Sequence, residues 1–247
     1  MGDLGVEASV LAGLPGLVHA FGRRSGPAGF ETREDTAART TSLLASRGRL
    51  LLLRQVHGAA VAKAPWSGRP SADAAVASEP GFFLGIETAD CLPVLIVDPR
   101  RRAVAAVHAG WRGTVAGVTR AAVAALVREG SLPADLLAAL GPGIGSCCYE
   151  VGDDVKAAFG PAGAAYFAPS PAGRHYLDVR AANLGQLVES GLDEGRIGAV
   201  NECTHCRPDL YHSYRRDGPG SGRMISVVGF VGPAAIPAST PSRPAPG

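Results

Sequence analysis

Three side chains with metal-binding chemistry each stand beside an apolar run of the sequence. His57 follows the apolar segment 50–56, Cys91 lies between two apolar segments, and His108 follows the apolar segment 103–107. Residues at strand ends leave the core and commonly face a crevice, so these side chains could converge. Two imidazoles and one thiolate suit Zn²⁺, and three protein ligands leave a fourth position open, as in catalytic zinc sites. Spacing alone does not link the three residues, because no short-range ligand motif joins them.

A thiol mechanism competes with the zinc site at the same residues. Cys91 could act as a nucleophile with His57 or His108 as its base. The other four cysteines are Cys147, Cys148, Cys203 and Cys206. Cys203 and Cys206 have the CxxC form, but a four-cysteine zinc site needs a second pair, and adjacent cysteines rarely chelate one metal well. We therefore interpret these four as structural or incidental, and we expect all five cysteines to be reduced.

Two further segments could bind an anion. After His108 the sequence runs Ala-Gly-Trp-Arg-Gly-Thr, a turn into a helix whose free N–H groups could hold an anion with help from Arg112. Near the end, Ser213, Arg215, Arg216 and Arg223 combine a hydroxyl with arginines that suit a phosphate. The alternatives are a tight glycine-containing turn and a basic loop in contact with solvent.

The composition allows an ordinary globular core. The 247 residues are 46% hydrophobic and 19% charged, and the net charge of +2 is spread along the chain. That distribution argues against a nucleic-acid partner, which needs a clustered basic face. The apolar runs are strand-sized, and the first residues carry Asp3 and Glu7 without a basic segment, so we expect no membrane span and no signal peptide. We therefore predict a cytoplasmic protein.

The pattern of strands and helices favours one α+β layered domain. Predicted strands cover Arg49–Val56, Phe82–Ile86, Val94–Val97, Ala103–His108, Tyr176–Val179, Ile197–Val200 and Met224–Phe230. Predicted helices run from a cap at Thr114 to Gly130, over Glu150–Phe159, and over Val179–Ser190. We place a single catalytic zinc-binding domain at 8–230 and a flexible tail rich in Pro and Ala at 231–247.

The order of several unusual motifs resembles one known family. These motifs are Arg54–Gly58, Ala72–Ala74, Thr88–Pro93, His108–Gly113, Cys147–Val151 and Ser213–Arg216. The chain resembles, over nearly all of residues 10–230, the YfiH or laccase-domain family, historically labelled polyphenol oxidases or multicopper laccases. Later members were described as purine nucleoside phosphorylases that also deaminate adenosine.

The resemblance implies a fold, a metal and substrates. It implies a four-layer α/β/β/α sandwich with mixed sheets and zinc at His57, Cys91 and His108. Substrates would be adenosine, inosine, guanosine and methylthioadenosine, with phosphate as co-substrate. Alternatives are a zinc- or thiol-dependent amide hydrolase that edits peptidoglycan precursors, and a copper polyphenol oxidase, although the chain has only six histidines. We expect a monomer or a weak oligomer.

The two reactions assign roles to candidate residues. In phosphorolysis, phosphate attacks C1′ of the ribose while the purine leaves, and Arg24, Arg215, Arg216 and the helix start at Arg112 could hold the anion. In deamination, a zinc-activated water would attack C6 of adenine, and a carboxylate would carry protons. Asp90, Asp73 and Glu87 are the candidates for that carboxylate. The sequence departs from the family in its first loop, where Arg24 takes the arginine position, and in Ser221-Gly222-Arg223 near the end.

Overall fold

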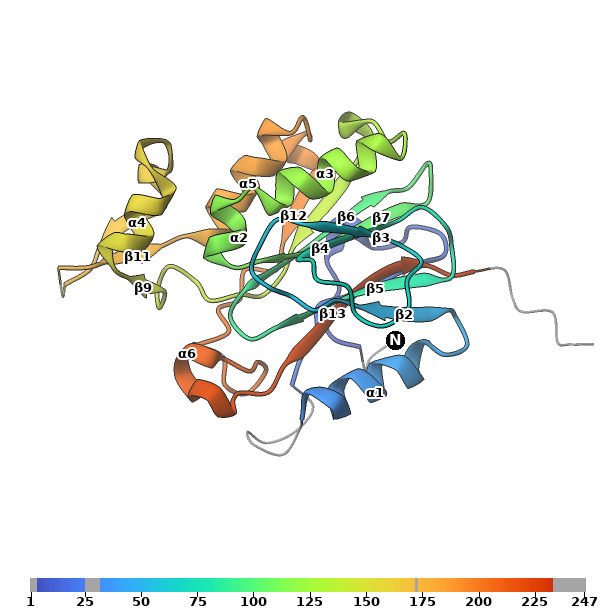
Figure 1. Ribbon diagram of the computed structural model, residues 1–247, viewed down its shortest axis with the longest axis horizontal. Helices are drawn as coiled ribbons and strands as arrows, with labels where there is room; N and C mark the ends of the chain where they lie inside the picture. Colours follow the sequence, from blue (N-terminus) through green and yellow to red (C-terminus); the bar gives the residue numbers. More distant parts are fainter. Residues whose placement is uncertain (1–3, 25–31, 172, 233–247) are drawn as a thin grey trace, which may run out of the picture.

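Two β-sheets pack face to face, and helices cover the outer face of each sheet (Figure 1). The structure, a computed structural model, describes residues 4–24, 32–171 and 173–232. Both sheets are mixed, since β2 pairs parallel with β5 and β12 pairs parallel with β8, whereas the central pairs are antiparallel. The α+β class and the four-layer α/β/β/α arrangement that the resemblance implies are therefore confirmed.

The described residues form three sheets. The small sheet has the order β1 (Leu17–Ala20), β13 (Met224–Phe230), β5 (Phe82–Thr88) and β2 (Arg49–Leu52). The large sheet has the order β12 (Ile197–Ala199), β8 (Leu137–Leu140), β6 (Leu92–Asp98), β7 (Ala103–Ala109), β4 (Ala74–Ala77) and β3 (Val61–Lys63). A third, three-stranded sheet lies apart from the sandwich and has the order β10 (Phe167–Pro169), β11 (His175–Leu177) and β9 (Glu150–Val151).

Six α-helices and five short 3₁₀ helices complete the described chain. The α-helices are α1 (Arg33–Leu44), α2 (Trp111–Val115), α3 (Val118–Arg128), α4 (Asp153–Phe159), α5 (Val179–Glu189) and α6 (Tyr214–Asp217). The 3₁₀ helices are Ser9–Leu11, Pro133–Asp135, Pro161–Tyr166, Glu194–Arg196 and Gly218–Gly220. None of the helices in the described ranges is both long and apolar enough to span a membrane.

Alternating side chains of β6 hold the layers together. Val94 and Ile96 pack under α3 and α5 in one core cluster, whereas Leu95 and Val97 face the small sheet in another. Successive strand residues point to opposite faces, so one apolar run serves both cores. On the far side of the small sheet, Leu44 of α1 packs in a third cluster with strand residues. The apolar strands that the sequence predicts are thus the centre of the sandwich.

The helix predicted from Thr114 to Gly130 is two helices. α2 ends before Gly117, which has φ 78°, and α3 begins at Val118 with Gly117 as its N-cap. Thr114 therefore lies inside α2, where its hydroxyl donates to the carbonyl of Gly110. The expected cap at Thr114 is wrong because the left-handed residue that separates the helices is a glycine three positions later.

The helices differ from the sequence prediction at two other places, and strands β1, β3, β4 and β8 were not predicted. The predicted helix 150–159 begins instead as strand β9, and α4 starts only at Asp153. Helix α1 was not predicted, because its sequence is mostly polar. It starts with a capping box in which Thr32 and Asp35 exchange side-chain and backbone hydrogen bonds, and this pattern is visible in the sequence.

The register of the large sheet gathers the candidate ligands. In the antiparallel pair β6–β7, Leu92 lies opposite Ala109 and Pro93 opposite His108. Cys91, which immediately precedes β6, therefore lies beside the last residues of β7. Asp73 stands just before β4, and its carbonyl accepts the backbone N–H of His108 at 2.7 Å. Strand pairing alone therefore places Asp73, Cys91 and His108 together at one end of the strands of the large sheet.

The domain boundaries at 8 and 230 stay a prediction. β13 ends at Phe230, and Val6 also pairs with Phe21 through backbone hydrogen bonds. Of the predicted tail 231–247, residues 233–247 lie outside the described residues.

Replacing one buried leucine of α3 tests the helix–sheet layer. Leu126 is fully buried under the sheet, whereas its neighbour Val127 is 42% exposed. We expect Leu126→Ala to lower the free energy of unfolding by about 2–5 kcal/mol. Val127→Ala, the matched control, should change it by less than ~1 kcal/mol. Urea unfolding of both variants measures the difference, and equal effects would contradict this packing.

Candidate metal centre and its cavity

His57, Cys91 and His108 lie together at one end of the sandwich. Each offers a ligand atom, and these atoms lie within 4.8 Å of one another. Cys91 Sγ is 4.0 Å from His57 Nε2, and the two imidazole rings meet edge to face with centroids 4.8 Å apart. Two such ligands on one zinc ion would lie ~3.6 Å apart, from Zn–N and Zn–S bond lengths. The three residues therefore fit a metal ion after small side-chain movements.

Asp73 orients His57 and His108 through hydrogen bonds. Its Oδ1 lies 2.8 Å from His108 Nδ1, which leaves Nε2 of His108 available as a ligand. The same carboxylate accepts backbone N–H groups of Val56 at 3.1 Å, His57 at 2.8 Å and Gly58 at 2.7 Å. A carboxylate that holds the second nitrogen of a histidine is the usual outer partner of a metal site. Asp73 is fully buried and does not line the cavity described below.

The backbone around the group is shaped for close approach. A Cβ atom on Gly110 would lie 3.0 Å from His57 Cδ2 and 3.1 Å from Cys91 Sγ. His57 and Asp90 adopt positive φ values of 61° and 87°, which non-glycine residues rarely do. Such strain concentrates at functional sites, where the surrounding structure holds it in place.

Cys91 and His108 form a charged pair in the metal-free chain. Burial works to raise the pKa of Cys91, but His108 and His57 lower it to about 6. Burial works to lower the pKa of His108, but the Cys91 thiolate and Asp73 raise it to about 9. At neutral pH the sulfur is therefore a thiolate, which is the form that binds metal ions.

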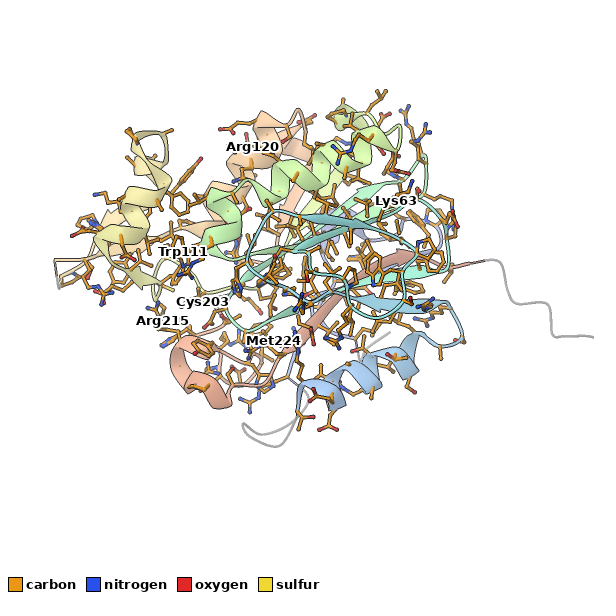
Figure 2. The ribbon with its side chains drawn as sticks, viewed as in Figure 1. Lys63, Trp111, Arg120, Cys203, Arg215 and Met224 are labelled. Carbon is orange, nitrogen blue, oxygen red and sulfur yellow. The ribbon has the colours of Figure 1, made fainter. Side chains whose placement is uncertain are left out.

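The three residues open into a cavity of about 680 Å³. Its walls include the aromatic rings of Trp111, Tyr149 and Tyr214, and four arginines: Arg33, Arg180, Arg215 and Arg223. Figure 2 shows Trp111 of α2, Cys203 and Arg215 of α6 at the same end of the molecule. The cavity thus combines metal-binding, aromatic and cationic side chains.

Four of the candidate residues outside the trio line the cavity. Asp90 does so, and its two oxygens accept Thr204 Oγ1 at 2.6 Å and the backbone N–H of Arg215 at 2.7 Å. Arg215 and Arg223 line it as well, and both donate to backbone carbonyls. Glu87, the third carboxylate considered for proton transfer, also lines the cavity, and its side chain pairs with Arg33 and Arg69.

Four other predicted residues are not among those that line the cavity. Arg112 is exposed, with its guanidinium 4.3 Å from the ring centroid of Trp111. Ser213 is the buried N-cap of α6, and Arg216 donates to three backbone carbonyls and pairs with Asp217 at 2.8 Å. Arg24 donates to the carbonyl of Pro208 at 2.5 Å. Ser213, Arg216 and Arg24 stabilise the loop around α6, whereas Arg112 packs on Trp111, which itself lines the cavity. Anion binding by these four residues stays a prediction.

Sequence reasoning missed most of the cavity wall. Arg33, Gln55, Tyr149, Arg180 and Tyr214 come from five separate segments. Gln55, Tyr149 and Tyr214 lie inside the motifs that define the resemblance, so the sequence contained a partial indication of them. Arg33 and Arg180 stand on helices without a motif, and only the fold brings them to the site.

The fold and this ligand group define a layered α+β protein with a two-histidine, one-cysteine site. A sequence model of the family described as "Multi-copper polyphenol oxidoreductase laccase" matches residues 27–231. The chain therefore belongs to the laccase-domain family, and the resemblance to YfiH proteins is confirmed.

Named relatives of this chain are enzymes of purine metabolism. The chain is 41% identical over 178 residues to a purine nucleoside phosphorylase of Deinococcus radiodurans, covering 72% of this chain and 69% of that one. It is 39% identical over 163 residues to adenosine deaminase RL5 of an unknown prokaryotic organism, covering 63% and 61%. The crystal structure of YlmD from Geobacillus stearothermophilus superposes with a TM-score of 0.79 at 27% identity, covering 93% of this chain and 99% of that one.

The charged pair predicts an unusual reactivity of Cys91 towards iodoacetamide. In chelator-treated protein, carbamidomethylation of Cys91, followed by peptide mass spectrometry, should reach half its maximal rate near pH 6. Cys147 gives an internal control, because burial and its neighbouring cysteines raise its pKa to about 11. In His108→Gln the midpoint for Cys91 should rise towards the ordinary thiol value. A wild-type midpoint for Cys91 above pH 8 would contradict the charged pair.

Proposed function

We propose that this protein is a zinc-dependent purine nucleoside phosphorylase that also deaminates adenosine. The observation that carries the proposal is one cavity in which the His57–Cys91–His108 group faces both aromatic and cationic walls. The substrates would be adenosine, inosine, guanosine or methylthioadenosine, with phosphate as co-substrate. The names of the relatives support this assignment.

The aromatic walls suit a purine base. Trp111 and Tyr149 offer flat faces on which a heterocycle can stack, and Tyr214 adds a third ring to the cavity wall. Burial raises the pKa of Tyr149 to about 12, so its phenol keeps its proton at neutral pH. A protonated phenol can donate a hydrogen bond to a ring nitrogen of the leaving purine, where negative charge develops.

The cationic walls suit phosphate. In the described chain Arg180 and Arg223 donate to backbone carbonyls, and Arg215 also lies against the ring of Tyr149. These partners are neutral, so Arg180, Arg215 and Arg223 keep their positive charges. Arg33 and Arg69, by contrast, pair with the carboxylate of Glu87, which offsets part of their charge. An arginine group of this kind can bind the phosphate that attacks C1′. The C1′–O bond forms as the C1′–N9 bond breaks, giving ribose 1-phosphate and the free base.

Zinc at the three-residue group would supply a Lewis acid and an activated water close to the base. His108 keeps the required tautomer because Asp73 accepts its Nδ1 proton, and Asp73 acts as a positioning residue in this scheme. For proton transfer in deamination we favour Asp90 over the other carboxylates. It lines the cavity next to Cys91, whereas Glu87 is held by two arginines and Asp73 lies behind His108.

A thiol-dependent amide hydrolase is the second candidate. The low pKa of Cys91 beside a histidine is the arrangement of an activated cysteine nucleophile. Such an enzyme would act on a peptidoglycan precursor without metal. A copper oxidase is less well supported, because in the described residues His19 contacts the backbone of Ala8 and His175 pairs with Asp153, away from the trio.

Incubation with adenosine, with and without phosphate, separates these activities. We expect adenine and ribose 1-phosphate only when phosphate is present, and inosine in either case. Cys91→Ala and His108→Ala should keep the fold, lose zinc and lose activity by roughly 10²-fold or more, because the metal stabilises the transition state by several kcal/mol. His175→Ala is the matched histidine control and should behave as wild type.

Other outcomes contradict the proposal. Full phosphorolysis by metal-free protein would overturn the zinc dependence. Absence of any purine product, with cleavage of muropeptide precursors by chelator-treated enzyme, would favour the hydrolase. Oxygen uptake with a phenol, together with bound copper, would favour the oxidase.

A further inference from the structure

We propose that Cys147, Cys148, Cys203 and Cys206 bind a second metal ion, in a closed structural site separate from the three-residue group. The four sulfur atoms lie within 4.8 Å of one another. Two of these cysteines precede β9 and two precede α6, so the pairs come from segments nearly sixty positions apart. The adjacent pair Cys147–Cys148, which no local motif links to the CxxC pair, is the second pair that a four-cysteine site needs.

The sulfur separations fit one tetrahedral ion. Cys147 Sγ lies 3.7 Å and Cys148 Sγ 3.3 Å from Cys206 Sγ. Four thiolates around zinc at the usual Zn–S distance would lie ~3.8 Å apart. A disulfide requires about 2.05 Å, and all four cysteines are free thiols in the structure. The cluster is also compact enough for a single ion at its centre.

Backbone N–H groups already point at one sulfur. Gly145 donates its N–H to Cys203 Sγ at 3.2 Å, and Cys203 also accepts the backbone N–H of Cys206. Hydrogen bonds of this kind stabilise a thiolate, and thiolate is the form that coordinates metal. A Cβ atom on Gly145 would lie 3.2 Å from Cys147 Sγ, so a glycine here lets the turn close around the sulfurs.

A charged partner stands beside the cluster. Four thiolates around a divalent ion carry a net charge of −2, which a neighbouring cation would offset. The Cys203 and Cys147 thiols act electrostatically on Arg180, whose guanidinium donates to carbonyls of Gly141, Val200 and Glu202. Arg180 therefore braces both cysteine-bearing segments and supplies positive charge close to the sulfurs.

The site would fix one wall of the cavity. Cys147 and Cys203 line that cavity, and the segments already touch through the N–H of Thr204 and the carbonyl of Gly143 at 3.1 Å. Four protein ligands leave no open position, which is the mark of a structural metal. The ion would hold the loop of Tyr149 against the loop of Arg215 without taking part in the reaction.

Metal counting on protein purified with a reducing agent and reloaded with Zn²⁺ tests the site. We expect about two zinc ions per chain in wild type and about one in the double variant Cys148→Ser/Cys206→Ser. The double variant His57→Ala/His108→Ala should also hold about one, at the other site. Ser146→Ala, in the same turn but without a ligand, is the matched control and should hold two.

Spectroscopy of Co²⁺-loaded protein tests the site even if the cysteine variants do not fold, because it uses a variant that keeps all four cysteines. The His57→Ala/His108→Ala variant should show the intense sulfur-to-cobalt charge-transfer band of a tetrahedral four-thiolate site. Two results would overturn the proposal: the same zinc content in the reduced, reloaded wild-type chain and in Cys148→Ser/Cys206→Ser, or a cobalt spectrum without thiolate charge transfer in the His57→Ala/His108→Ala variant. Peptide mapping that finds these cysteines joined as disulfides in freshly isolated, metal-replete protein would also overturn it.

Discussion

The site depends on the hydrogen bonds that the buried carboxylate of Asp73 accepts. This carboxylate has no exposed surface, and it accepts three backbone N–H groups from the turn at His57 together with the imidazole of His108. An ionised group in the interior is costly unless it is fully hydrogen-bonded, and this one is. Burial works to raise the pKa of Asp73, but the bonds from His108, Gly58 and His57 lower it, so the carboxylate stays charged. One side chain thus ties the two histidines to each other.

The sheets turn this local contact into a rigid site. Asp73 precedes β4, Cys91 precedes β6, and His108 lies near the end of β7, so their relative positions follow from strand register. Sites built on strands keep their geometry better than sites on loops. The helices that cover the large sheet bury its outer face and leave one end of the sandwich for chemistry. Arg215 of α6 and Arg223, which follows α6, line the same cavity, and the contacts of Arg216 stabilise the loop that carries them.

The sequence predicted much of the sandwich, because the central strands are continuous apolar runs that end in polar residues. It also predicted the histidine and cysteine trio, through strand ends and the family motifs. It could not assign Asp73 its place behind His108, since one acidic residue beside a strand gives no indication of its partner. Arg216 and Ser213 looked like anion ligands by composition, yet the fold uses them to brace and cap α6. The four remaining cysteines come together only through long-range contacts that no local pattern records.

Metal affinity of the Asp73→Asn variant tests this account most directly. The substitution keeps the size of the side chain but turns one acceptor into a donor that faces backbone N–H or imidazole. Competition with a chelator should show zinc binding at the trio weakened by roughly 10–100-fold, as expected when the outer partner of a metal ligand is lost. Glu87→Gln, at another buried carboxylate beside the cavity, should leave that affinity nearly unchanged. Wild-type affinity in Asp73→Asn would contradict the central role of the carboxylate.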